Sequence, residues 1–354
     1  MLFTKGYVSN SRNAQSQLDE VSGARRGYKA NEDAFAPILQ QAGLQVNEGI
    51  IPLDVYQEFD NVTVQRIRSD DGDTFLNDLL PRARAINIGK MVFKHRKVSD
   101  AGNAQTSMSG QTGVNMDQVE YSYDGTIVPI HDIGFGRNFR EMAAQSSEGF
   151  DALIDDQRES IATLRRKLVD SFMDGHIDRD GNSIVVDGLS WTGMRNDSRI
   201  AQINVGASGI NFDFTDVTQS YASIEKAFKE VRNIMWITNN CGKDLTVYIS
   251  REMASNFERQ SSESYGSAKL IERLAGLMGI AGFKVSNKLV GNEFMGFPQD
   301  EMLRPLTGMA INTVAMPRVK YNDNHEFVSW CAVGWEARTD FENRKCAFFA
   351  QDLG

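Results

Sequence analysis

The sequence predicts an α+β fold, and three observations support this class. One helix near the middle of the chain is much longer than the others. Two strands before it enclose a segment that holds almost no apolar residue. After it, helices and strands alternate, and the last strands are rich in aromatic side chains. Sheets and amphipathic helices in this order bury their apolar faces against one another, as mixed α+β domains do.

The N-terminal region is predicted to be an arm. Residues 1–30 are polar and carry few large apolar side chains, so we expect them to extend away from any core. Residues 31–44 are predicted to form a short helix that Pro37 interrupts. Denser apolar patterning begins at residue 50, where we expect compact structure to start.

A long hairpin follows the arm. Residues 90–98 and 119–133 are predicted to be its strands, and the Asp-Gly pair at 124–125 is a turn signal inside the second strand. Residues 99–113 contain almost nothing that a core could bury. A structureless tip of this length is typical of functional loops, and an arm that reaches beyond its own domain explains it.

The first strand of the hairpin is basic. Alternation places Lys94 and Arg96 on one side and His95 and Lys97 on the other. No aromatic platform interleaves with these cations within the strand, as single-strand nucleic-acid binders require. The pattern therefore favours a solvated strand, or one that pairs with acidic residues of a neighbouring subunit.

The longest helix is predicted over residues 147–173 and measures about 40 Å. Ser147 caps its start and Gly175 suits its end. Its apolar side chains recur at the helical period and form one stripe, so the helix lies across a sheet or along a neighbour. The stripe consists of Phe150, Leu153, Ile154, Ile161, Leu164, Leu168 and Phe172.

Two helices are predicted in the following part of the chain. Residues 216–235 form the first, which Thr215 or Asp216 caps, and residues 268–279 form the second. Val217 and Met278 lie on the faces that we expect to point inward.

Five strands complete the expected elements. Three belong with these helices, at 244–249, 283–290 and 308–315, and together they indicate a mixed α/β unit. The last two, at 326–338 and 345–350, are predicted to form a closing pair.

Composition excludes several classes of protein. The chain has 354 residues, with 38 Lys and Arg against 47 Asp and Glu, so its net charge is −9. This balance disfavours nucleic-acid binding through phosphate neutralisation. No segment approaches the roughly 20 apolar residues of a membrane span, and the first residues do not resemble a signal peptide. We expect a soluble cytoplasmic product.

The motifs of common enzymes and cofactor sites are missing from the sequence. The four histidines are scattered, and neither a nucleophile elbow nor a phosphate-binding glycine loop occurs. Residues 176–187 resemble a calcium loop, but His176 is a poor first ligand for a hard cation and Asp187 is short for the last position. We interpret this segment as a polar turn after the long helix.

The three cysteines, Cys241, Cys331 and Cys346, form no C-x-x-C pair. We expect free thiols in a reducing cytosol. A cysteine nucleophile would require a histidine that folding brings near it, and the sequence alone does not show one.

Taken in order, these parts resemble the major capsid proteins of tailed bacteriophages and the related encapsulin shell proteins. The resemblance rests on residues 91–113 as the extended loop, 147–175 as the spine helix, 274–290 as a helix and strand of the axial domain, and 335–353 as the closing strands. It covers most of the chain and is architectural.

The resemblance implies a phage major capsid protein fold with four parts. The peripheral domain contains the spine helix at about 147–174, an antiparallel sheet and the extended loop at about 84–130. The implied divisions are the N-terminal arm at 1–48, the peripheral domain at 49–180, the axial α/β domain at 181–317 and the closing strands at 318–354.

The resemblance also implies a function without enzyme activity, cofactor or metal. It predicts a structural subunit that forms hexamers and pentamers of an icosahedral shell around double-stranded DNA. The partners are other copies of the chain, a portal protein, a separate scaffolding protein and, where present, a decoration protein. The location is the virion, after assembly in the host cytoplasm. The predicted inter-subunit contacts are Lys94, Arg96, Lys97, Asp100, Gly102, Gly110 and Gly113.

Two alternatives remain open at this point. An encapsulin-like nanocompartment shell would share the architecture and enclose a cargo enzyme. A cytosolic cysteine-dependent enzyme would use Cys241, Cys331 or Cys346 with one of the histidines.

Overall fold

A computed structural model of the chain describes residues 23, 26, 73–111, 113, 116–141, 152–260, 269–320 and 322–353. The chain divides into two units, residues 1–64 and 65–354, and the three sheets of the described residues belong to the second. The helix expected at 31–44 and the first residues of the long helix lie outside the described residues. Gly23 and Arg26, in the predicted arm, are helical and exposed, which differs from an extended chain.

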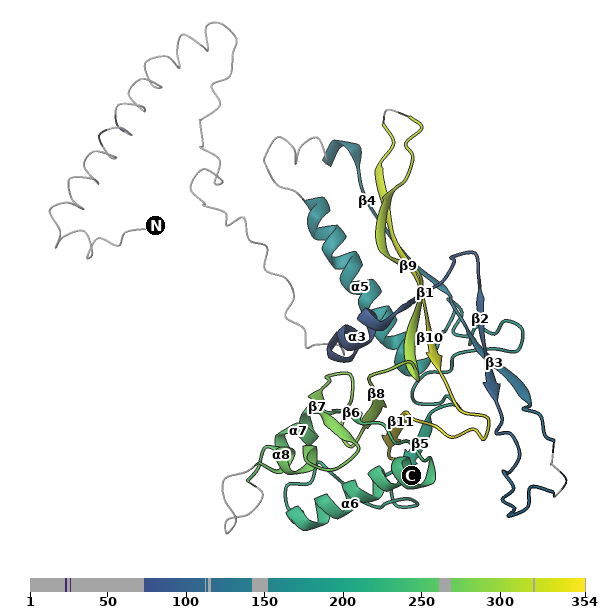
Figure 1. Cartoon of the computed structure of the whole chain (residues 1–354). Helices are drawn as coiled ribbons and strands as arrows, with labels where there is room; N and C mark the ends of the chain where they lie inside the picture. Colours follow the sequence, from purple (N-terminus) through teal and green to yellow (C-terminus); the bar gives the residue numbers. More distant parts are fainter. Residues whose placement is uncertain are drawn as a thin grey trace, which may run out of the picture. The chain divides into compact units, whose positions relative to one another are not determined.

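Helices and strands of the described chain are shown in Figure 1. The helices are α3 (Asp73–Leu79), the 3-10 helix η2 (Leu80–Arg82), α5 (Ala152–Asp174), α6 (Tyr221–Asn233), the π-helix η3 (Ile234–Thr238), α7 (Arg251–Phe257) and α8 (Leu270–Ala275). The strands are β1 (Arg84–Ala85), β2 (Val92–Val98), β3 (Tyr121–Ile127), β4 (Ile130–Arg137), β5 (Ala201–Asn204), β6 (Leu245–Ile249), β7 (Ile280–Val285), β8 (Phe294–Pro298), β9 (Leu303–Ala315), β10 (His325–Ala337) and β11 (Phe348–Gln351).

The long helix α5 packs on a four-stranded sheet. The strand order is β1-β9-β10-β4, with β10 antiparallel to both neighbours and β1 parallel to β9. The hydroxyls of Ser160 on α5 and Ser329 on β10 lie 3.0 Å apart. Leu164, Leu168 and Phe172 of the predicted stripe are buried, whereas Ile154, near the start of α5, was predicted in the stripe and is exposed. The single apolar stripe is therefore explained, because only one side of α5 faces the sheet.

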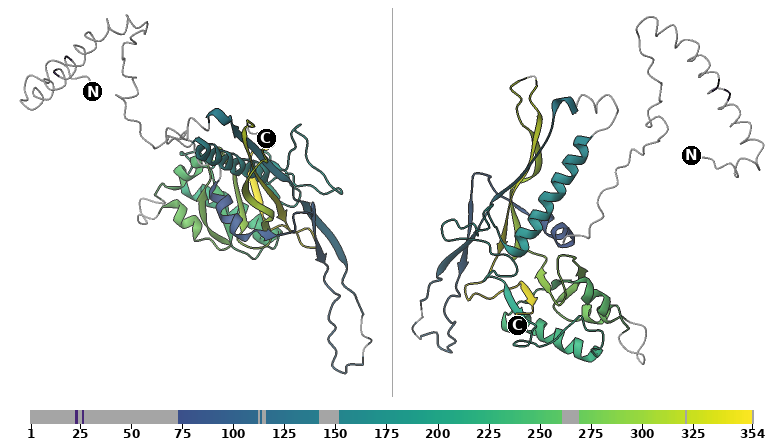
Figure 2. Two further views of the ribbon diagram at one scale, coloured as in Figure 1. Left: turned by 90° about the horizontal axis from the view of Figure 1, so that it is seen from above. Right: turned by 180° about the vertical axis from the view of Figure 1, so that it is seen from behind.

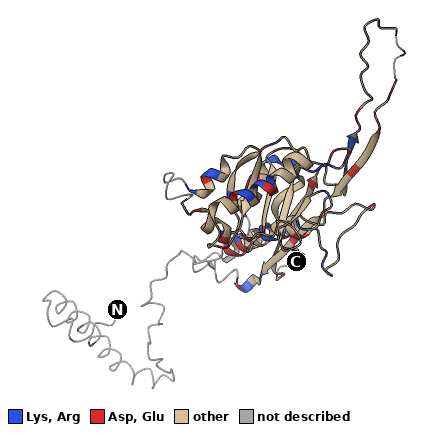
Figure 3. Cartoon of the chain, turned by 90° about the horizontal axis from the view of Figure 1, so that it is seen from below, with Lys and Arg blue, Asp and Glu red and all other residues tan. Residues whose placement is uncertain are grey.

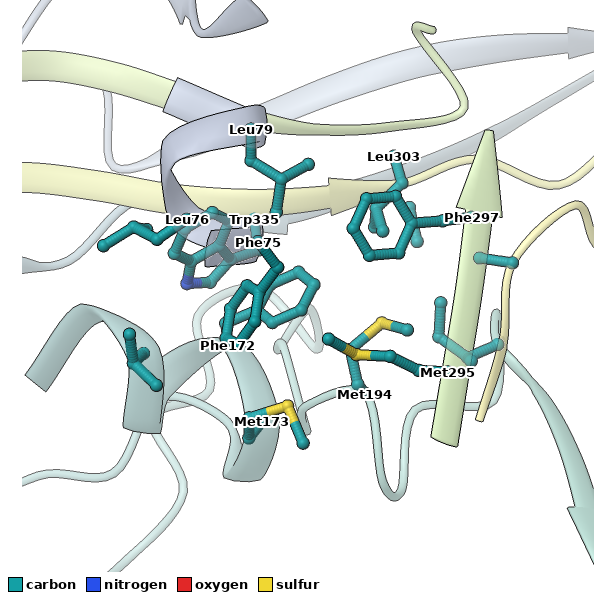
Figure 4. Close-up of a cluster of buried hydrophobic side chains, with 14 of the residues drawn as sticks. Phe75, Leu76, Leu79, Phe172, Met173, Met194, Met295, Phe297, Leu303 and Trp335 are labelled. Atoms are coloured by element: carbon teal, nitrogen blue, oxygen red, sulfur yellow. The ribbon is translucent and has the colours of Figure 1, made fainter. Parts of the chain in front are cut away.

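Phe172 lies at the centre of the first hydrophobic core. Its ring centroid is 5.0 Å from that of Phe75 on α3, 5.0 Å from that of Trp335 on β10 and 6.2 Å from that of Phe297 on β8. Figure 4 shows these side chains in one cluster with others from the same elements and with Met194 and Leu303 from other parts of the chain. Since β8 belongs to the second sheet, this core joins the two sheets.

The second sheet has five strands in the order β5-β11-β8-β6-β7. Every residue of β6 and β8 is buried, because both faces of these strands are covered: α6, α7 and α8 pack on one face around a second core, and Tyr248, Met295 and Phe297 on the other face join the first core. Parallel pairing joins β11 to β5 and β6 to β7, and the other pairs are antiparallel. Mixed pairing with helical cover agrees with the predicted α/β unit.

Strands β2 and β3 form a separate two-stranded ribbon. They pair antiparallel, with His95 opposite Asp124, and the Ser99 amide continues the ladder to the Glu120 carbonyl at 2.9 Å. Figure 2 shows the ribbon and its loop extending away from the two sheets. The extended hairpin that the sequence predicts is therefore present, as is the predicted α+β class.

Two strands lie in a different sheet from the one expected. The strand predicted at 308–315 is part of β9, which pairs with β10 in the four-stranded sheet. The predicted closing pair does not form, because β11 pairs with β5 and β8. Apolar alternation reports that a strand is half-buried but does not identify its partner. The domain boundaries themselves remain predictions.

Asp124 and Gly125 lie in the middle of β3, where the sequence indicated a turn. A Cβ at Gly125 would lie 2.5 Å from the Phe93 carbonyl oxygen, so the glycine permits close approach of the strands. Val217 and Met278 were predicted to point inward and are exposed, since α6 begins after the Ser220 cap and α8 ends at Ala275. The strand predicted at 119–133 is two strands, β3 and β4, which lie in different sheets. Helices α3 and α7 and strands β1, β5 and β8 are additional to the predicted elements.

Candidate assembly surface

A buried carboxylate holds the part of the ribbon that contacts the rest of the chain. We call this part, around His95 and Lys97, the root of the ribbon. Glu336 on β10 is fully buried, and its side-chain oxygens lie 3.0 Å from His95 Nδ1, 2.8 Å from Arg304 Nε and 3.0 Å from Arg338 Nε. Burial opposes ionisation of Glu336, but the hydrogen bonds from Arg304 and Arg338 and the close approach of His95 outweigh it and lower its pKa to about 2. The ionised network therefore joins β2 to β9 and β10.

A second set of polar contacts involves Lys97, which lies two residues after His95 on the same side of β2. Lys97 Nζ donates to Thr339 Oγ1 at 2.5 Å and lies 3.1 Å from Asp124 Oδ2. Arg199 Nη1 donates to the Gly125 carbonyl at 2.7 Å. These contacts tie β2 and β3 to the loops around Arg199 and Thr339. Because they use charged groups that are largely buried, the root of the ribbon is held firmly.

The opposite face of the ribbon is exposed and combines basic with aromatic side chains. Arg96 pairs across the strands with Tyr123, and Val98 pairs with Tyr121. Tyr121 and Tyr123 are 58% and 69% exposed, and Val98 is 49% exposed. Lys94 belongs to the same face, which carries no carboxylate within β2 and β3, although Lys94 Nζ lies 3.9 Å from Asp187 Oδ2. Figure 3 shows basic and acidic residues along the ribbon as well as on the rest of the chain. We call Lys94, Arg96, Val98, Tyr121 and Tyr123 the outer face.

The ribbon continues into an exposed loop. Asp100, Gly102, Gly110 and Gly113 are exposed, as are the other described residues between 100 and 120. The two sides of the loop come close at Gly102, where a Cβ would lie 2.9 Å from the Asp117 Cβ. Gly110 has φ +65° and its amide donates to Ser107 Oγ at 2.9 Å, which forms the turn at the end.

The predicted contact residues therefore fall into two groups. Lys94, Arg96 and the four loop residues are on the surface, as alternation and composition predicted. Lys97 points inward and binds Thr339, far along the sequence. Contact of any of these residues with another subunit remains a prediction.

The outer face also contains residues that the sequence pattern did not single out. Tyr121 and Tyr123 supply the aromatic groups that β2 itself lacks, because they come from the paired strand. Their alternation was visible in the sequence, but their exposure and their register with Arg96 required the structure.

The calcium-like segment is a polar turn, as interpreted. Asp178 Oδ1 accepts hydrogen bonds from the amides of Asp180 and Asn182, each at 2.9 Å, so this carboxylate serves the turn. His176 is buried, and its ring centroid lies 5.8 Å from that of His131 on β4. Burial lowers the pKa of His131 to about 4 and that of His176 to about 3.

The cysteines differ from the expected free thiols. Cys241 and Cys346 form a disulfide, and Cys331 is fully buried. Burial raises the pKa of the Cys331 thiol to about 11, which disfavours the thiolate that a nucleophile requires. The arrangement does not provide the activated thiol of a cysteine-dependent enzyme.

The part of the chain that the structure describes offers neither a metal-ligand cluster nor a membrane-spanning helix. No cluster of three or more His, Cys, Asp or Glu side chains could hold a metal ion among these residues. None of the described helices has the length and apolarity to cross a membrane.

The fold is similar to solved capsid structures. A chain of the capsid of Myoviridae phage XM1 is 12% identical, with a TM-score of 0.62, and the match covers 87% of this chain and 100% of that one. The capsid of an empty GTA particle gives 13% identity and a TM-score of 0.51, with 87% and 100% covered. A chain from Gordonia phage Cozz gives 10% identity and a TM-score of 0.54, with 88% and 96% covered.

These likenesses confirm the predicted phage capsid protein fold. Among curated proteins, none matches the chain. A family model described as "Family of unknown function (DUF6260)" matches residues 45–350, which is most of the sequence. The chain therefore belongs to the DUF6260 family and has the phage major capsid protein fold.

Proposed function

We propose that this protein is the major capsid protein of a tailed bacteriophage. Its copies assemble into hexamers and pentamers of an icosahedral shell that encloses double-stranded DNA. The observation that carries the proposal is the match to the XM1 capsid chain, which covers all of that chain and 87% of this one. Because a fold alone does not define a function, the surface of the ribbon provides the second support.

The outer face has the composition of a protein interface. Tyrosine and arginine are enriched where proteins bind one another, and the two tyrosines are more than half exposed in a single chain. The ribbon cannot bury this face against its own sheets, since its inner face already makes the contacts to Glu336 and Thr339. A second copy of the chain, with its net charge of −9, offers acidic surface for Lys94 and Arg96.

The proposed inter-subunit contacts are Lys94 and Arg96 on the outer face and Asp100, Gly102, Gly110 and Gly113 in the loop. We assign Lys97 a different role. Its contacts with Thr339 and Asp124 hold the ribbon at a defined angle to its own subunit. A firm root makes the position of the outer face reproducible, as repeated contacts in a closed shell require.

The further partners are a portal protein, a separate scaffolding protein and, where present, a decoration protein. The packaged DNA is enclosed without sequence-specific binding. An acidic subunit suits this task, because a negatively charged wall does not retain the DNA through its phosphates. The protein is then located in the virion after assembly in the host cell.

Sedimentation of the purified chain tests the proposal. We expect hexamers, pentamers or closed shells, and shells isolated from infected or induced cells should contain nuclease-protected DNA. A nanocompartment would instead contain one host enzyme at a fixed ratio to the shell protein. A chain that stays monomeric at all concentrations, alone or with the product of a neighbouring scaffold gene, would contradict the proposal.

A further inference from the structure

The Cys241–Cys346 pair connects two parts of the five-stranded unit that are 105 residues apart in the sequence. Cys241 follows the π-helix η3, and its amide donates to the Met235 carbonyl at 3.1 Å. Cys346 lies two residues before β11. Their Cα atoms are 5.3 Å apart, a separation that a disulfide spans without movement of the backbone.

The contacts around this pair do not depend on the bond between the sulfurs. The Lys345 amide donates to Asn239 Oδ1 at 3.2 Å, and the Ala201 amide donates to the Ala347 carbonyl at 2.9 Å. Phe348, Phe349 and Ala350 of β11 are buried between β5 and β8. The fold therefore holds the two thiols together when they are reduced.

We propose that Cys241 and Cys346 form a redox-dependent crosslink, which is open in reducing surroundings and closes in oxidising ones without a change of fold. The crosslink secures β11, a strand of only four residues that lies inside the sheet. Peeling of such a short strand is a local opening, and the closed crosslink opposes it. This inference is independent of the proposed shell function.

The two cysteines take different parts in the reaction. Cys346 is partly exposed, whereas Cys241 is 3% exposed. The Cys346 thiolate attacks a small-molecule disulfide such as glutathione disulfide and releases one glutathione thiolate. The Cys241 thiolate then attacks the Cys346 sulfur and releases the second glutathione. The protein loses two electrons and two protons, and glutathione disulfide is reduced to two molecules of glutathione.

Cys331 provides an internal reference. It is fully buried in the first core, away from the pair, and remains a thiol in both states. Alkylation in denaturant should therefore modify one cysteine after treatment with glutathione disulfide and all three after treatment with dithiothreitol. Peptide mapping without reductant should recover the Cys241 and Cys346 peptides joined together.

Thermal unfolding measures the effect of the crosslink. The Tm of the oxidised chain should exceed that of the reduced chain by about 5 °C or more, because the closed loop is long. Cys346→Ser and Cys241→Ala should each remove this redox dependence and unfold near the Tm of the reduced wild type. Cys346→Ser replaces a partly exposed side chain and keeps the test usable if Cys241→Ala fails to fold.

The order of attack has its own test. With glutathione disulfide, folded Cys241→Ala should gain one glutathione at Cys346, whereas folded Cys346→Ser should gain none. Three alkylated cysteines after oxidation of the wild type, or equal Tm values for its two redox states, would overturn the crosslink. Faster glutathione addition at Cys241 than at Cys346 would overturn the proposed roles.

Discussion

The Glu336 carboxylate and the His95 imidazole lie 3.0 Å apart, although 241 positions separate them in the sequence. Their contact joins the exposed ribbon to the C-terminal end of β10 in the four-stranded sheet. Arg304 and Arg338 complete the network, so one carboxylate orients side chains from three strands or their ends. The position of the outer face depends on this network.

Replacement of Glu336 should destabilise the chain strongly. Glu336→Gln keeps the shape but removes the charge, and it leaves the buried Arg304 guanidinium with only the exposed Glu301 carboxylate, at 3.5 Å. We expect a loss of about 3 kcal/mol in the free energy of unfolding, measured in urea. The control is Glu342→Gln, whose partner Arg344 is on the surface, with an expected loss below about 1 kcal/mol. Equal losses for the two variants would contradict the network.

Acid should weaken the fold through two buried histidines. In the unfolded chain each has a pKa of about 6.5, whereas burial lowers the pKa of His131 to about 4 and that of His176 to about 3 in the folded chain. Below about pH 6.5 the unfolded state therefore binds more protons, and stability falls as the pH decreases. Each histidine contributes a slope of about 1.4 kcal/mol per pH unit in this window.

His176→Leu isolates this effect, because it removes one titrating ring from an apolar site. Urea unfolding between about pH 7.5 and pH 4.5 should show a smaller slope for the variant than for the wild type. Glu336 contributes only below about pH 4.5, since its folded pKa is about 2. A wild-type unfolding free energy that does not change over the histidine window would refute the assignment.

Two glycines after α5, Gly175 at the helix end and Gly181 in the polar turn that follows, should differ in their tolerance of alanine. Gly175 and Gly181 both have positive φ, +97° and +85°, but only Gly175 is enclosed, with a Cβ position 2.7 Å from the Trp191 carbonyl oxygen. We expect Gly181→Ala to cost about 1 kcal/mol from backbone strain, and Gly175→Ala to cost about 2 kcal/mol more. Similar Tm values for the two variants would argue against this helix end.

The apolar stripe of α5 gives a further prediction on stability. Leu168 is fully buried against the sheet, and Leu168→Ala should cost about 2–5 kcal/mol in urea unfolding. Ile154, on the same helix, is 45% exposed, and Ile154→Ala should cost much less. A near-neutral Leu168→Ala would show that α5 does not pack as described.

Much of this fold is visible in the sequence. The period of Leu164, Leu168 and Phe172 identifies α5 and its buried side, and Gly175 marks its end. The polar loop after β2 identifies the hairpin. The strand partners could not be predicted in this way, because the apolar run Phe348–Ala350 of β11 could be buried in either sheet. Its pairing with β5 and β8 depends on tertiary packing.

Of the candidate assembly surface, only the exposed residues of the outer face could be predicted from the sequence. Alternation separates Lys94 and Arg96 from His95 and Lys97, and the structure confirms this division. The partners of the inner pair, Glu336 and Thr339, are distant in the sequence and share no local pattern with it. The Cys241–Cys346 disulfide could not be predicted either, because cysteine pairing cannot be deduced from the sequence alone.

The outer face predicts variants that fold but assemble poorly. Arg96→Glu and Tyr123→Ser change exposed side chains, so the monomer should melt within a few degrees of the wild type. Both should reduce the yield of assembled particles in sedimentation by about tenfold or more. The matched variants Arg96→Lys and Tyr123→Phe should retain most of the assembly. Unimpaired assembly of Arg96→Glu would exclude this face from the contact.

The most direct test of the central claim is electron microscopy of particles formed by the purified chain, with its scaffold protein where assembly requires one. We predict closed icosahedral shells in which the ribbon of each subunit lies on the next and buries Tyr121 and Tyr123. Monomers at every concentration, or particles whose outer face points to solvent, would contradict the account.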